Sequence, residues 1–222
     1  MNLGDRMKAY ESAWKITFPP RMPIILRIDG KAFHTFTKGY EKPFDWLVAE
    51  WMLRATKALM DQVQGATIGY TQSDETSLFL HTYNKFDSES WFSGNKGKIE
   101  TVATSIFTEA FNSAGTHKPA HFDCRAFVLP KEEVYNYFLW RERDCERNAI
   151  SAFGRHKFGH EKCHGKSTTH LCAMFDDKEW NDVPEAFKHG TYMFQDNALT
   201  RGLIDGESQT LIEELVNFQE EE

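Results

Sequence analysis

The sequence predicts an α+β protein with a ferredoxin-like fold, in which strands and helices follow in the order β-α-β-β-α-β. Three observations support this prediction. An apolar run at residues 23–28 is typical of a fully buried strand. The stretches 46–65 and 98–115 each repeat apolar side chains with the period of a helix. Between them, two strand-like runs at 66–70 and 77–83 are joined by a connection short enough for a hairpin.

The first helix is expected to begin directly after Asp45, because an aspartate side chain is a good N-cap. Val48, Met52 and Leu59 fall on one face of this helix and predict the side that packs on the sheet. Gly65 suits the C′ position at the end of the helix, where a left-handed backbone is common.

The second half of the pattern begins with the helix at 98–115, followed by a half-buried strand at 121–129 that stops at a proline. A long helix is predicted over 131–156. We expect residues 1–140 to form the catalytic domain, and residues 141–222 to form a helical C-terminal extension that packs on it as one integrated unit.

Composition predicts a soluble protein of the cytoplasm. No apolar run approaches the roughly 20 residues that a membrane span needs, and the N-terminus lacks the apolar core of a signal peptide. The four cysteines include no C-x-x-C pair, so we expect them to be reduced. The 26 basic and 33 acidic side chains give a formal net charge of −7, which argues mildly against a general nucleic-acid-binding protein.

Two acidic segments are predicted to meet at one edge of the sheet. In the split β-α-β pattern the end of the first strand, at Asp29 and Gly30, lies beside the turn that holds Asp74 and Glu75. Neighbouring carboxylates repel each other unless a cation lies between them, and Mg²⁺ binds carboxylates together with substrate phosphates. The alternative is two unrelated acidic turns, since Asp-Gly is a common turn pair.

Several motifs then occur in an order that resembles a known family. The segments "RIDGKAFHTFTKGYEKPFD", "SDETSLFL", "FDCRAFVLP" and "WRERDCERNA", with the later "HGKST" and "FKHGTY", resemble the tRNA-His guanylyltransferases and their Thg1-like relatives. The resemblance implies a domain like the palm of polymerases, which adds nucleotides to the 5′ end of tRNA in the 3′-to-5′ direction. It also implies two Mg²⁺ ions, binding of tRNA, GTP, ATP and other NTPs, and a homotetramer.

The resemblance also implies roles for individual residues. Asp29, Gly30 (through its carbonyl) and Asp74 match the metal-binding positions, and Asp29, Asp74 and Glu75 are the expected catalytic residues. The residues that match nucleotide-binding positions are Arg27, Lys31, Ala32, Phe33, His34, Lys42, Asp45, Ser73, Lys98 and Asn148. In the family's pattern Lys42 and Ser73 correspond to triphosphate contacts. His34 and Asp45 correspond to the base, and Arg27 and Lys98 to activation of the tRNA end.

One departure from the family's pattern bears on the substrate. The eukaryotic tRNA-His enzymes carry "HINNLYN" where residues 146–152 read "ERNAISA", and only Asn148 is kept. Glu146 therefore places a carboxylate where the eukaryotic branch has a histidine, and an RNA backbone would repel it. The sequence resembles the Thg1-like branch associated with repair of 5′-truncated tRNAs, so we expect activity that is not restricted to tRNA-His.

The stretch 141–166 holds seven basic residues against four acidic ones. Two interpretations stay open: a surface that contacts tRNA phosphates, or a solvated helix face. The candidate RNA-binding residues are Arg143, Arg147, Arg155, Lys157 and Lys166.

Two other patterns in this part of the chain point to weaker hypotheses. The segment "GHEKCHGKST" has five residues between Gly159 and Gly165, whereas a P-loop needs four. The nearby histidines and cysteines have zinc-ligand chemistry but lack the paired spacing of a zinc knuckle. They are His156, His160, Cys163, His164, His170 and Cys172.

The expected reaction is an in-line attack by the 3′-hydroxyl of an incoming NTP on an activated 5′ phosphate. One metal ion would lower the pKa of the hydroxyl and the second would neutralise the triphosphate. Two rival functions use the same fold. A nucleotide cyclase would need a purine pocket and no RNA-binding face, and a non-catalytic RNA-binding protein would lack the metal.

Overall fold

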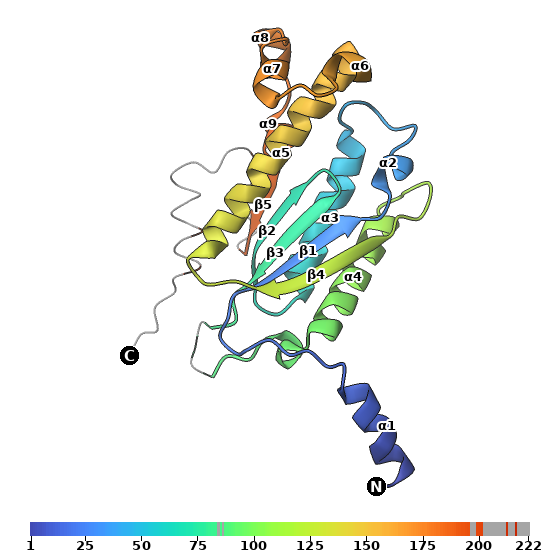
Figure 1. Cartoon of the computed structure of the whole chain (residues 1–222), viewed down its shortest axis with the longest axis vertical. Helices are drawn as coiled ribbons and strands as arrows, with labels where there is room; N and C mark the ends of the chain where they lie inside the picture. The colour runs from blue at the N-terminus through green and yellow to red at the C-terminus, as the bar shows by residue number, and fades with distance from the viewer. Residues whose placement is uncertain (84, 86, 196–198, 202–211, 213–215, 217–222) are drawn as a thin grey trace.

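The computed structural model describes residues 1–83, 85, 87–195, 199–201, 212 and 216 (Figure 1). Within them it contains one antiparallel sheet of six strands, in the order β4-β1-β3-β2-β5-β6. The strands are β1 (Ile24–Gly30), β2 (Ala66–Gln72), β3 (Glu75–Leu80), β4 (Phe122–Val128), β5 (Thr191–Phe194) and β6 (Leu199–Arg201).

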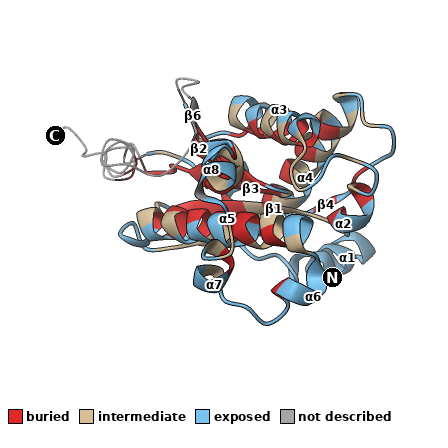
Figure 2. Ribbon diagram, turned by 90° about the horizontal axis from the view of Figure 1, so that it is seen from above, coloured by how far each residue is buried: buried red, intermediate tan, exposed pale blue. Residues whose placement is uncertain are grey.

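Helices cover both faces of this sheet. They are α1 (Leu3–Ser12), α2 (Phe33–Phe36), α3 (Trp46–Gln62), α4 (Lys96–Ser113), α5 (Glu133–Phe158), α6 (His160–Cys163), α7 (Thr168–Cys172), α8 (Asp177–Asn181) and α9 (Glu185–Lys188), with a 3₁₀ turn at Trp91–Gly94. In Figures 1 and 2, α3 and α4 lie on one face and α5 crosses the other. None of the described helices combines the length and apolar character of a membrane span. The predicted β-α-β-β-α-β order is confirmed.

The hairpin of β2 and β3 is inserted as the split β-α-β pattern requires. Strand β3 lies between β1 and β2 and runs antiparallel to both, so β1 and β2 are parallel to each other. The register places Asp29 of β1 opposite Glu75 of β3 and, on the other side, opposite Asp123 of β4. Three carboxylate-bearing positions are therefore neighbours at one end of the sheet.

Alternation along β1 divides the core into two layers. Ile24, Leu26 and Ile28 pack into the cluster that includes residues of α3 and α4, whereas Ile25 packs with residues of α5 such as Phe138. All five side chains are fully buried. Because both faces of the central strand are covered, this strand reads as a continuous apolar run.

The predicted N-cap of α3 is confirmed. The Asp45 carboxylate accepts hydrogen bonds from the backbone N–H groups of Leu47 and Val48, at 2.9 and 3.0 Å. The helix ends at Gln62 and its C-cap is Val63, so Gly65 lies one residue beyond the expected C′ position. Gly65 has φ +82°, a left-handed conformation that favours glycine, and so belongs to the turn that leads into β2.

The C-terminal part differs from the expected helical extension. Helix α5 runs through residues 140 and 141, so the anticipated division falls inside one continuous helix. Residues 191–201 return to the sheet as β5 and β6, with β5 paired to β2. The short helices α6 and α7 pack on the far end of α5 through a small separate core around Ile150, Cys163 and Leu171. All four cysteines are free thiols, as expected.

Candidate active site

A two-residue turn at the end of the β2–β3 hairpin carries the first acidic side chain of the site. Gln72 and Glu75 are paired in register, which leaves Ser73 and Asp74 as the turn. Ser73 has φ +49°, in the left-handed region that glycine occupies more easily. Its hydroxyl donates a hydrogen bond to the Asp74 carboxylate at 3.2 Å. The turn therefore holds a non-glycine residue under backbone strain beside the acidic group.

The second acidic side chain, Asp29, lies next to Asp74. The backbone N–H of Gly30 donates to the carbonyl oxygen of Asp74 at 3.0 Å, which fixes the two chain segments together. Burial, and next the negative charge of Asp29, raise the pKa of Asp74 to about 6. Among the described residues, no lysine or arginine forms an ion pair with Asp29 or Asp74. The pair is an uncompensated negative site.

Gly30 is required where these segments meet. A Cβ atom built at residue 30 would lie 2.4 Å from the ring of Phe33 and 3.1 Å from the Cβ of Asp74. The first of these distances is shorter than any real contact, so a larger residue would push the acidic turn or the ring away. The glycine seen in the sequence therefore sets the spacing of the two aspartates.

The chemistry of these groups suits a hard divalent cation. Asp29 and Asp74 offer carboxylate oxygens, the ligands that Mg²⁺ prefers. Across the described part of the chain, no set of three or more histidine, cysteine, aspartate or glutamate side chains is arranged to hold a metal ion. A cation here would thus keep coordination positions for water or substrate phosphate, as Mg²⁺ usually does. The same finding gives no support to zinc at the His/Cys cluster, in which Cys163 is buried while His160 and His164 are exposed.

Glu75 is in a different electrostatic situation from the two aspartates. Its carboxylate accepts from Arg141 Nε at 2.6 Å and from Arg141 Nη2 at 3.0 Å, on α5. It also accepts from Arg27 Nε at 2.9 Å. Both guanidinium groups compensate its charge, and the side chain is only 7% exposed. The Glu75 carboxylate is therefore bound by arginines of the protein itself, on the α5 face of the sheet.

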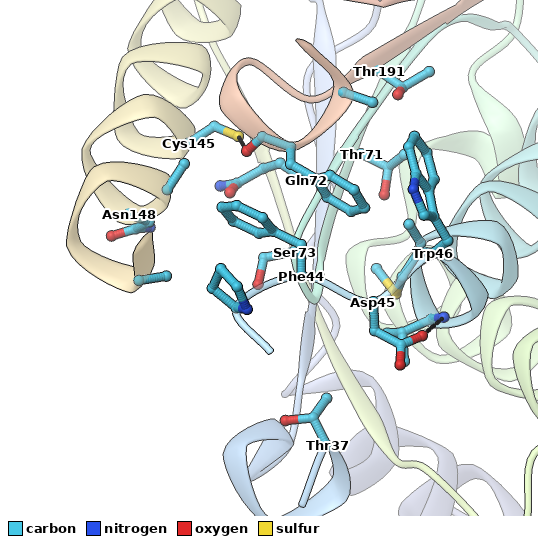
Figure 3. Close-up of a pocket in the computed structure, with 18 of the residues that line it drawn as sticks. Thr37, Phe44, Asp45, Trp46, Thr71, Gln72, Ser73, Cys145, Asn148 and Thr191 are labelled. Atoms are coloured by element: carbon cyan, nitrogen blue, oxygen red, sulfur yellow. Dashed lines mark hydrogen bonds between the residues drawn. The ribbon is translucent and has the colours of Figure 1, made fainter. Parts of the chain in front are cut away.

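A pocket of about 580 Å³ opens beside the acidic turn. Figure 3 shows Asn148 and Cys145 entering from α5, Asp45 and Trp46 from the start of α3, and the strand end with Gln72 and Ser73 between them. The rings of Phe44 and Phe187 stack with centroids 4.9 Å apart, and both line the pocket. Aromatic faces with polar side chains at the rim suit a planar heterocycle bound beside phosphates.

The structure brings most of the sequence-predicted residues to this region. Phe33, Lys42, Asp45, Ser73 and Asn148 line the pocket. Arg27 belongs to β1, and Lys31, Ala32 and His34 follow directly after its end at Gly30. These four therefore flank the acidic pair rather than the pocket.

Lys98 is not brought to the site. It lies in the first turn of α4, with its ammonium 5.9 Å from the ring of Phe92. The other end of α4 contacts the site region, since the Phe111 ring is 5.8 Å from that of Phe33. Thirteen residues of helix separate Lys98 from Phe111, or roughly 20 Å at 1.5 Å per residue.

Sequence reasoning missed three aromatic residues of the pocket, Phe44, Trp46 and Phe187. The first two stand beside the predicted N-cap Asp45 and could have been proposed from that position. Phe187 comes from α9, more than 130 residues further along the chain, and no local pattern connects it with Phe44. It reaches the pocket because β5, which follows α9, pairs with β2.

The candidate RNA-binding residues lie on the exposed side of α5 and beyond its end. Arg147 forms an ion pair with Asp144, and Lys157 forms one with Glu179. Three of the five candidates have no ion pair with any described residue, and all five are exposed. The three are Arg143, Arg155 and Lys166.

An antiparallel sheet that ends in two uncompensated aspartates, next to a pocket of nucleotide size, is the arrangement expected of a nucleotidyltransferase. Comparison with known proteins gives the particular family. Residues 4–130 match the family model described as tRNAHis guanylyltransferase. The chain belongs to this family, whose members add nucleotides to tRNA in the 3′-to-5′ direction, and the family prediction made from the motifs is confirmed.

Solved structures agree over nearly the whole chain. A bacterial tRNA(His) guanylyltransferase (Thg1)-like protein in complex with ATP is 37% identical, with a TM-score of 0.91 over 97% of this chain and 100% of the other. Such a protein in complex with GTP is 36% identical, with a TM-score of 0.80 over 97% of this chain and 99% of the other.

The tRNA(His) guanylyltransferase of Schizosaccharomyces pombe is 32% identical over 66% of this chain, but the match spans only 57% of that longer protein.

Proposed function

We propose that this chain adds nucleotides to the 5′ end of tRNA and that its main activity is repair of 5′-truncated tRNAs of several identities. The observation that carries the catalytic part is the Asp29–Asp74 pair, which is adjacent and uncompensated and lies next to Ser73, a residue of the pocket lining. Family membership favours this reading over a nucleotide cyclase or a non-catalytic RNA-binding protein.

Asp29 and Asp74 would hold Mg²⁺, with the carbonyl of Gly30 as a further oxygen ligand. When bound, two such ions would activate the attacking hydroxyl and neutralise the triphosphate. The protein's own contribution is positional, because phosphoryl and nucleotidyl transfer need little covalent work from side chains. The Gly30 N–H bond to the Asp74 carbonyl holds the two carboxylates at a fixed separation.

The pocket would take the incoming nucleotide. The base would lie against the stacked rings of Phe44 and Phe187, while the hydroxyl of Ser73 and the exposed ammonium of Lys42 would meet the phosphates. The similar bacterial proteins bind ATP and GTP, which supports this assignment. The Asp45 carboxylate already accepts from three backbone N–H groups, so its expected part at the base would be to shape the pocket.

The tRNA would approach along α5, with Arg143, Arg155 and Lys166 contacting its phosphates. Glu146 is exposed on the same helix and would repel an RNA backbone at that point. The added nucleotide would be selected by base pairing with the opposite strand of the acceptor stem. The protein would then need to recognise only the shape and the phosphates of the RNA. The homotetramer that the resemblance implies and the cytoplasmic location that the composition predicts are part of the same proposal.

The test is to incubate the protein with Mg²⁺ and each of the four labelled NTPs, using 5′-truncated tRNAs of several identities. We expect the added nucleotide to complement the base opposite the gap in every tRNA. Addition of guanine to tRNA-His alone, whatever the opposing base, would overturn repair in favour of tRNA-His guanylylation. Cyclic nucleotide formed from NTP without RNA would favour the cyclase instead.

A further inference from the structure

A buried arginine on α5 connects the acidic hairpin with the wall of the pocket. Arg141 is only 2% exposed, although arginine is rarely so well buried unless it is paired. Its guanidinium binds Glu75 through Nε and Nη2, and the same Nη2 donates to the Asp144 carboxylate at 2.6 Å. One side chain therefore satisfies two carboxylates from different parts of the chain.

Each carboxylate leads to a different part of the active site. Glu75 follows Asp74 directly in the sequence and lies opposite Asp29 in the sheet register. Asp144 accepts a hydrogen bond from the Asn148 side-chain amide at 3.3 Å, and Asn148 lines the pocket. The contacts form a continuous path from the acidic pair, through Arg141, to a residue that would meet the nucleotide.

Stability alone is a poor explanation for this arrangement. A buried ion pair contributes little net stability, because the cost of removing both charges from water offsets their attraction. Apolar side chains of similar size would fill the same space between α5 and the sheet. A planar guanidinium, however, fixes both distance and orientation to two carboxylates, which a lysine ammonium does not.

Glu75 has little capacity left for a metal ion. Oε1 accepts from Arg141, and Oε2 accepts from Arg141 and Arg27. A metal ligand at this residue would have to leave two guanidinium groups without their partner in a largely buried site. The neighbouring Asp74 has no such engagement with a cation among the described residues.

We propose that Arg141 and Glu75 form a positioning clamp for nucleotidyl transfer. The clamp holds the pocket wall on α5 at a fixed distance from the metal-binding turn, and Glu75 acts through Arg141 rather than on the metal. This inference rests on the proposed function, because it assumes a nucleotide in the pocket and metal at Asp29 and Asp74.

The first test compares Arg141→Lys with the wild type. Lysine keeps the positive charge and loses the fork, so we expect GTP binding, measured by calorimetry with Mg²⁺ and without tRNA, to weaken about 10-fold. The KM for nucleotide should rise and kcat should fall, while the Mg²⁺ concentration for half-maximal activity should stay within about twofold. Lys57→Met on the exposed side of α3 is the control, with unchanged binding.

A second variant separates positioning from folding. Glu75→Gln combined with Arg141→Met removes both charges together, so that no buried charge is left alone. We expect its melting temperature to return close to that of the wild type while GTP binding stays weak. Recovery of wild-type GTP binding together with stability would overturn the clamp and leave the pair a structural contact.

Glu75→Gln alone tests the metal role. A rise of more than about 10-fold in the Mg²⁺ concentration for half-maximal activity would overturn the inference and make Glu75 a ligand. An unchanged Mg²⁺ requirement with weakened GTP binding would support it. If the wild-type protein binds GTP but does not add it to tRNA, the proposed function is overturned. The clamp can still be tested in that case, because its test is GTP binding by the variants.

Discussion

Asp74 and Glu75 are consecutive residues of one hairpin, but the protein treats their charges in opposite ways. Asp74 lies beside Asp29 without a cationic partner among the described residues, and its pKa is raised to about 6. Glu75 is held by two guanidinium groups. Under our proposal Asp74 is the carboxylate that binds a cation from outside the chain, whereas Glu75 already has its cations within the protein.

The largest expected effect comes from removing either aspartate. Asp29→Ala or Asp74→Ala should lower nucleotide addition by at least about 100-fold, because metal-ion catalysis supplies several kcal/mol of transition-state stabilisation. Thermal stability should be unchanged or higher, since each change relieves repulsion. Activity is measured with labelled GTP and a 5′-truncated tRNA, and Asp182→Ala is the exposed control. Full activity of Asp29→Ala in Mg²⁺ would contradict the metal assignment.

Neutral variants of the neighbouring residues Asp74 and Glu75 should change the stability of the protein in opposite directions. In metal-free protein at pH 7, Asp74→Asn should raise the free energy of unfolding by about 1–3 kcal/mol, because it removes a carboxylate held above its usual pKa. Glu75→Gln should lower it by about 3 kcal/mol, because it leaves buried guanidinium charge without a partner. Urea unfolding in the presence of a chelator measures both free energies. Equal changes in the two variants would contradict the difference we infer between Asp74 and Glu75.

The raised pKa of Asp74 also predicts a pH dependence. The folded state binds this proton more tightly than the unfolded state, so metal-free protein loses stability as pH rises from about 4 to about 6. Above that range the loss is complete. Melting temperatures at pH 5 and pH 7 should show the difference in the wild type, and the difference should shrink in Asp74→Asn. An identical pH profile in both proteins would assign the effect to other groups.

The same contrast exists among the basic residues of α5 and its end, where Arg141 is buried and paired while Arg155 and Lys166 are exposed. If the exposed residues contact tRNA phosphates, binding should weaken with salt. Arg155→Gln and Lys166→Gln should each reduce the log–log salt slope by roughly 0.7–0.9. Filter binding between 50 and 200 mM salt measures this, because three phosphate contacts predict a loss of affinity of about 20- to 40-fold over that range. Lys8→Gln on α1 is the control. A tRNA affinity independent of salt would exclude these contacts.

The smallest expected effect concerns the strained residue of the turn. Ser73→Gly should stabilise the hairpin by about 0.5–1 kcal/mol, because glycine accepts a positive φ without cost. It should also raise the KM for nucleotide about threefold to 10-fold, through loss of the hydroxyl. Ser73→Ala keeps the strain and loses the hydroxyl, so it should share the KM effect without the gain in stability. Equal stability of the two variants would remove strain as the cause.

The sequence by itself determined the local elements and the acidic edge. Apolar periodicity predicted β1, α3, the β2–β3 hairpin, α4 and β4, because the buried face of each element is visible as a pattern of apolar side chains close together along the chain. The split β-α-β rule then placed Asp29 beside Asp74. Because β1 and β2 are parallel and β3 runs back between them, the end of β1 and the β2–β3 turn lie at the same end of the sheet. Gly30 was recognised from its motif, and its steric reason follows from the ring of Phe33.

Only the tertiary structure decided the partners of Glu75 and the far wall of the pocket. Arg141 lies 66 positions after Glu75 and Phe187 lies 143 positions after Phe44 in the sequence, and no local periodicity encodes either pairing. They meet because α5 crosses one face of the sheet and β5 returns to pair with β2. Charge compensation depends on distances of about 3 Å. The sequence alone therefore could identify two adjacent carboxylates but could not tell which of them the fold had already neutralised.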